Sequence, residues 1–100
     1  MTQYIEIFTH KFNNADDMYE HLQRDTVNFT KIEKRLKQAG MISATQFVHV
    51  GSNEYKHVGQ LLCKSKVAHD ACMDIMNSHV WDEEIPKQSS FETLMLHSER

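Results

Sequence analysis

Four short stretches of the chain alternate apolar and polar residues, which is the pattern of half-buried β-strands. They are Gln3–Phe12, Ser43–Val50, Tyr55–Cys63 and Phe91–His97. In the first stretch one face carries Tyr4, Glu6, Phe8, His10 and Phe12, and the other carries Ile5, Ile7 and Thr9. Because both faces hold apolar side chains, we expect both to be covered.

Two further stretches place apolar residues three and four positions apart, as an amphipathic helix does. The first follows an N-cap at Asn13-Asn14 and ends before Gly40, which suits the left-handed position after a helix. Its apolar stripe is broken around Asp25. The second follows an N-cap at Ser65, and its apolar rows are Val67, Ala71 and Ile75 and, beside them, Ala68, Cys72 and Met76.

The element order β-α-β-β-α-β predicts an α+β, ferredoxin-like fold, in which a four-stranded antiparallel sheet has both helices on one face. No repeat or linker divides residues 1–100, so we expect a single domain. The turn cluster Gly51-Ser52-Asn53-Glu54 joins the second and third strands. Its exact length is open, and so is the face of the third strand that lies beside Phe47 and His49. Two helices cover only one side of the sheet, which predicts a homodimer formed through the sheet face.

The net charge of −3 argues against a nucleic-acid-binding module, which usually gathers Lys and Arg on one face. The chain has no apolar run long enough for a signal peptide or a membrane span, so we expect a cytoplasmic protein that does not bind membranes. Cys63 and Cys72 fall at positions expected to be buried, which indicates reduced core residues.

The order of elements, the length near 100 residues and the run Leu61-Leu-Cys-Lys-Ser-Lys-Val-Ala68 resemble the dimeric α+β barrel proteins of the antibiotic-biosynthesis monooxygenase type. The resemblance implies a homodimeric α+β barrel and an enzyme that oxygenates a small molecule without a cofactor. Two aromatic or histidine positions of that family fall at Cys63 and Cys72. The asparagine of its haem-degrading branch has no counterpart in Gln3–Phe12, so haem degradation is disfavoured.

Histidine is the natural candidate for chemistry, because both of its protonation states are accessible near neutral pH. Glu6 and His10 share a strand face, where they could bind and deprotonate an acidic substrate in a small-molecule pocket between sheet and helices. The expected lining residues are Tyr4, Phe8, Phe47, His49, His57 and Trp81. The alternative is that these histidines lie at strand ends or an interface and make ordinary hydrogen bonds. We expect no metal, since no close ligand pair such as H-x-x-x-H is present.

Two functions remain open at this point. One is an enzyme resembling the cofactor-independent monooxygenases, acting on an apolar, ionisable organic substrate. The other is a non-catalytic dimer of the same fold that binds a small ligand or regulates. A pocket that holds a Glu and a His in contact favours the first, and a sheet face packed solidly against its partner favours the second.

Overall fold

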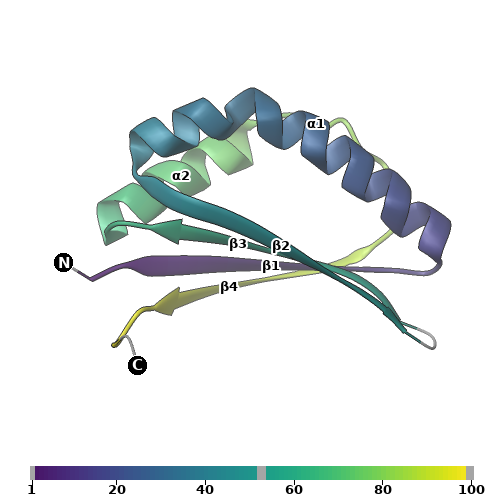
Figure 1. The fold of residues 1–100 in the computed structure, drawn as a ribbon. Coiled ribbons are helices and arrows are strands. Elements are labelled where there is room, and N and C mark those ends of the chain that lie inside the picture. Colours follow the sequence, from purple (N-terminus) through teal and green to yellow (C-terminus); the bar gives the residue numbers. More distant parts are fainter. Residues whose placement is uncertain (1, 52–53, 99–100) are drawn as a thin grey trace.

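A computed structural model describes residues 2–51 and 54–98. Its elements are β1 (Tyr4–Phe12), α1 (Ala15–Ala39), β2 (Met41–Gly51), β3 (Glu54–Cys63), α2 (Lys66–Ser78) and β4 (Gln88–Met95) (Figure 1). The predicted order and the ferredoxin-like class are confirmed. β2 is longer than predicted, and β4 begins and ends earlier. Ser52 and Asn53 of the predicted turn lie outside the described residues.

Both helices begin at the residues that the sequence indicates, and α1 also ends where the sequence predicts. Asn14 Oδ1 accepts the Asp17 amide at 2.8 Å, and Ser65 Oγ accepts the Ala68 amide at 3.1 Å. Gly40 ends α1 with φ of 116°, and a Cβ there would lie 2.5 Å from the Ala68 Cβ. Glycine is therefore needed both for the left-handed backbone and for the close approach of α2.

The sheet has the order β2-β3-β1-β4, all antiparallel, and both helices cover the same face (Figure 1). Phe8 pairs with Gly59, and Phe47 pairs with Val58. Successive residues of a strand point to opposite faces, so Phe47 lies on the side away from Phe8. This register answers the question that the turn left open: the helices face the side that carries Glu6, Phe8 and His10.

The apolar core fills only part of the space between helices and sheet. Its buried members are Ile32, Leu36, Met41, Leu61, Cys63, Ala68 and Cys72, and both cysteines have free thiols. These residues come from the second half of α1, from α2 and from the strand ends nearby. Val67 is 79% exposed, so the predicted row of Val67, Ala71 and Ile75 is not the buried face of α2. Neither described helix is both long and apolar enough to cross a bilayer.

The opposite face of the sheet is not covered by any described element (Figure 1). Phe47 is 54% exposed and Leu94 is 42% exposed on this face. Ile5, which pairs with Leu94, and Ile7 lie beside them on the central strand. The face that lacks cover is thus the one with Ile5 and Ile7, and Phe8 belongs to the helix side.

Candidate functional site

A cavity of about 910 Å³ lies between the helix-covered face of the sheet and the two helices. A volume of this size suits an organic ligand of drug-like dimensions. Its wall includes Glu6, Phe8, His10, His21, Asp25, Phe29, His57, Gly59, His69, Met73, Met76, Trp81, Glu83, Lys87, Ser89, Phe91 and Thr93. Apolar rings and thioethers form the middle of the wall, and polar groups form two separate ends.

Phe8 divides the two polar ends, because it stands between Glu6 and His10 on the same strand face. Its ring lies over Gly59, where an added Cβ would be 3.2 Å from Phe8 Cδ2. On the other side it meets Phe91 edge to face, with ring centroids 6.1 Å apart. The absence of a side chain at Gly59 is what leaves room for this aromatic floor.

The first polar end is a buried carboxylate and imidazole pair. Glu6 Oε1 lies 2.8 Å from His69 Nε2 and also accepts a hydrogen bond from the Thr93 hydroxyl. Burial opposes charge on His69, but Glu6 and Asp70 outweigh it and raise the pKa of His69. Glu6 Oε2 accepts no hydrogen bond from the described residues, which leaves one oxygen of this carboxylate for a bound molecule.

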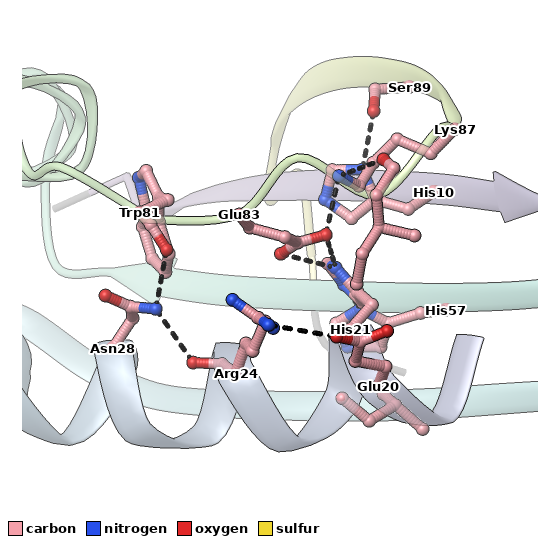
Figure 2. Close-up of polar contacts among 12 residues, drawn as sticks. His10, Glu20, His21, Arg24, Asn28, His57, Trp81, Glu83, Lys87 and Ser89 are labelled. Atoms are coloured by element: carbon pink, nitrogen blue, oxygen red, sulfur yellow. Dashed lines mark hydrogen bonds and ion pairs between the residues drawn. The ribbon is translucent and has the colours of Figure 1, made fainter. Parts of the chain in front are cut away.

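The second polar end is a chain of hydrogen bonds that joins α1, β3, β2 and the irregular segment before β4. Glu83 Oε1 lies 2.7 Å from His21 Nδ1, His21 Nε2 lies 2.9 Å from His57 Nδ1, and His57 Nε2 lies 3.0 Å from Gln46 Oε1 (Figure 2 shows the first three residues). The Gln46 oxygen can only accept, so His57 donates from Nε2. Burial and the neighbouring charge of His21 lower the pKa of His57 to about 4, so the ring is neutral and its Nδ1 accepts.

His21 stands between His57 and Glu83. Its Nε2 donates to His57 Nδ1, and its Nδ1 lies 2.7 Å from a carboxylate oxygen of Glu83. Burial alone would raise the pKa of Glu83, but Lys87 at 2.6 Å and His21 outweigh it and lower that pKa. The second end therefore places both His21 and Lys87 against the one carboxylate of Glu83.

His10 is neutral within the same end. Its Nδ1 is 2.7 Å from Ser89 Oγ, and its ring centroid is 5.0 Å from that of His21 (Figure 2). Burial, together with the charges of His21 and Lys87, lowers the pKa of His10 to about 4. Its Nε2 has no hydrogen-bond partner among the described residues, so it can meet a bound molecule. Such a ring is a weak base and a good orienting group.

The segment between α2 and β4 closes one side of the cavity, although it has no regular structure. Asn28 on α1 holds it, donating from Nδ2 to the Trp81 carbonyl at 2.7 Å (Figure 2). Asn28 also accepts a hydrogen bond from His79 Nε2 at 2.8 Å. Asp82 has φ of 50°, a left-handed conformation that aspartate tolerates. The turn there is followed directly by Glu83, whose side chain points inward to His21 (Figure 2).

Asp25 adds a carboxyl group to the α1 side of the cavity. It makes no hydrogen bond to the described residues, and burial raises its pKa. A carboxyl group with a raised pKa in a cavity is a candidate acid or base. Among the described residues, no three His, Cys, Asp or Glu side chains are arranged to bind a metal ion.

Five of the residues expected at the site lie on the cavity wall: Glu6, Phe8, His10, His57 and Trp81. The structure corrects the other three. Phe47 and His49 pair with Val58 and Lys56 on the outer face of the sheet, and His49 lies 3.5 Å from Glu54 there. Tyr4 faces the helices, but it lies beyond Glu6, next to the His69 ring, outside the cavity wall. Glu6 and His10 share the cavity without sharing a hydrogen bond.

The sequence pattern missed the partners that come from the helices and the irregular segment: His21, His69, Glu83 and Lys87. One signal was present. The apolar stripe of α1 is broken near Asp25, and His21 and Asn28, which flank the break, are both buried. His21 and Asn28 lie three and ten residues after the buried Met18, so they share its face of α1. They indicate a polar wall beneath that part of the helix.

No protein-family model matches this chain, and no curated protein does. Among solved structures, a dimeric ferredoxin-like protein from an uncultured marine organism superposes with a TM-score of 0.89 at 11% identity, over 100% of both chains. A second such protein from an uncultured marine organism has a TM-score of 0.82 at 16% identity, over 100% of this chain and 92% of that one. A monooxygenase from Streptomyces coelicolor, in complex with the ligand nanaomycin D, has a TM-score of 0.54 at 13% identity, covering 91% and 86%. At these identities the likeness shows the fold, and it confirms the fold that the resemblance implied.

Proposed function

We propose that this chain is an enzyme that removes a proton from an apolar, ionisable organic molecule and lets the resulting anion react with oxygen, without a cofactor. The observation that carries the proposal is the contact between Glu6 and His69, 2.8 Å long, on the wall of an organic-sized cavity. A coupled carboxylate and imidazole beside apolar walls is the arrangement that proton abstraction requires. The structurally similar monooxygenase, in complex with nanaomycin D, supports the same substrate class.

Each residue has a distinct role in this proposal. Glu6 takes the proton on Oε2, since Oε1 is already bound by His69 and Thr93. His10 stays neutral and orients a polar group of the substrate through Nε2. Phe8, Phe91 and Trp81 pack against the apolar part of the substrate, which displaces water from the cavity when it binds. Removal of water strengthens the electrostatic interactions of the buried groups and protects the reactive anion.

We also propose that the protein is a homodimer whose two sheets face one another. Phe47 and Leu94 are exposed on the face without cover, and a second copy of that face would bury them. The two most similar of the structures named above are described as dimeric. Formation of the dimer through this face leaves the cavity on the helix side of each sheet.

Anthrone is a suitable test substrate, because it is apolar and loses a proton from its methylene carbon. Its oxidation balances as anthrone plus O₂ giving anthraquinone plus water, so the substrate supplies all four electrons. The protein should accelerate oxygen uptake, and Glu6→Gln should reduce the rate by about 10²-fold or more. Glu92→Gln is the control, since Glu92 is exposed and pairs with Ile7 on the outer face. Binding of anthrone without oxygen uptake would refute catalysis and favour the non-catalytic ligand-binding dimer.

A further inference from the structure

The Glu6 and His69 pair continues outward to the protein surface. His69 Nδ1 lies 3.0 Å from Asp70 Oδ1, on the opposite side of the ring from Glu6. The side chains of Glu6 and His69 are each 7% exposed, whereas that of Asp70 is 55% exposed. Three groups therefore join the cavity wall to bulk water through one imidazole ring.

The contact between His69 and Asp70 is not expected from helix geometry alone. Neighbouring residues on a helix point in different directions, so consecutive side chains seldom meet. Here Lys66, one turn earlier, holds both oxygens of Asp70 at 2.7 and 2.8 Å. Lys66 and His69 together lower the pKa of Asp70, which keeps it an ionised acceptor for the Nδ1 proton.

We propose that His69 and Asp70 carry protons between the buried Glu6 and His69 pair and bulk water, on the side of the pair that faces away from the cavity. The inference rests on the proposed function only in that Glu6 receives the substrate's proton. His69 and Asp70 act through Glu6 and are positioning residues.

The proton balance of one cycle is simple. At rest Glu6 is ionised, His69 carries two ring protons, and Asp70 is ionised. A proton that arrives on Glu6 forms an O–H bond and cancels the carboxylate charge. His69 then gives its Nδ1 proton to Asp70, which releases it to water. The Glu6 and His69 pair has then taken up one proton and released one, so its net charge is unchanged. When Glu6 later gives its proton to the reaction product, water returns a proton through Asp70 to His69 Nδ1, and the starting state is restored.

The test is the rate at which the His69 ring protons exchange with water, measured by ¹H–¹⁵N NMR on the ligand-free protein at about pH 5, with His69→Gln for assignment. In Asp70→Asn the amide oxygen still accepts a hydrogen bond but cannot take a proton. We expect Nδ1 proton exchange to slow by about tenfold or more, since a positioned proton acceptor typically contributes about 10²-fold or more. Unchanged or faster exchange would show that Asp70 merely holds the ring, and it would overturn the proposal.

Two matched variants separate proton transfer from a general effect of charge. Asp74→Asn removes the same charge one turn further along α2, at an exposed position, and should leave exchange unchanged. Lys64→Gln removes one charge of the opposite sign at an exposed position just before α2 and should also leave exchange unchanged. Slowing in either variant would assign the effect to helix electrostatics and overturn the proposal. Because no ligand is present, inactivity toward anthrone would refute the proposed function and leave this result standing.

Discussion

Replacement of His57 by glutamine should make the protein less sensitive to mild acid. Burial and the charge of His21 lower the pKa of His57 from its ordinary 6.5 to about 4 in the folded protein. Below about pH 6.5 the unfolded chain accepts a proton at this residue, while the folded chain does not. The stability contributed by neutral His57 is thus fully present above pH 6.5 and is lost as the pH falls toward 4.

The size of this effect follows from the same pKa change. The full loss of stability is about 3.4 kcal/mol, since each pH unit between the two pKa values costs about 1.36 kcal/mol. His57 lines a cavity that water can enter, so we reduce the expected loss between pH 7.5 and pH 4.5 to about 1.5 kcal/mol. Glu83 has a lowered pKa, and its loss of stability falls at lower pH, outside this interval. His69 has a raised pKa, so its contribution is present in acid and opposes the loss.

The assay is urea denaturation at pH 7.5 and pH 4.5 at one protein concentration. The wild-type protein should lose about 1.5 kcal/mol more free energy of unfolding over this interval than His57→Gln does. His97→Gln makes the same change at an exposed residue and should behave like the wild type. Equal losses in the wild type and His57→Gln would show that the fold does not hold His57 neutral, which would refute the reasoning.

Two further predictions concern assembly and the fold. Phe47→Glu places a charge on the uncovered sheet face, so analytical ultracentrifugation should show a shift from dimer to monomer. The control Val67→Glu, on the exposed side of α2, should stay dimeric. A Phe47→Glu variant that stays dimeric would exclude this face as the interface. Gly40→Ala should lower the free energy of unfolding by about 1 kcal/mol or more, because alanine resists φ of 116° and would approach Ala68. Gln38→Ala on the exposed side of α1 is its control in urea denaturation, and a Gly40→Ala variant as stable as this control would contradict the strain at Gly40.

The features that the sequence predicts well are those with local causes. Asn14 and Ser65 cap their helices through amides only three residues away, and Gly40 ends α1 by its own backbone freedom. The alternation along β1 likewise places Glu6 and His10 on one face without reference to the rest of the chain. Local rules therefore suffice for the element order and for two residues of the site.

The features that the sequence does not predict depend on contacts between residues that are far apart in the chain. His69 is 63 residues from Glu6, and His21 is 62 residues from Glu83, so no local pattern connects them. The face of Phe47 depends on strand register, which shifts between Met41 and Ser43 and which the turn sequence does not specify. The exposure of Val67 depends on which side of α2 the sheet meets. Each of these is a property of the assembled layers.

The polar residues of β1 explain why the layers leave a cavity instead of a larger core. At Glu6 and His10 the helix-covered face carries groups that require partners, which come from His69 on α2 and Ser89 on β4. Replacement of a buried ion pair by apolar residues of similar volume is often neutral or stabilising by about 1–4 kcal/mol. Two carboxylate and imidazole pairs, Glu6 with His69 and Glu83 with His21, are therefore a poor way to stabilise a chain of 100 residues. Their presence on the wall of one cavity therefore supports the proposed function more than a role in stability.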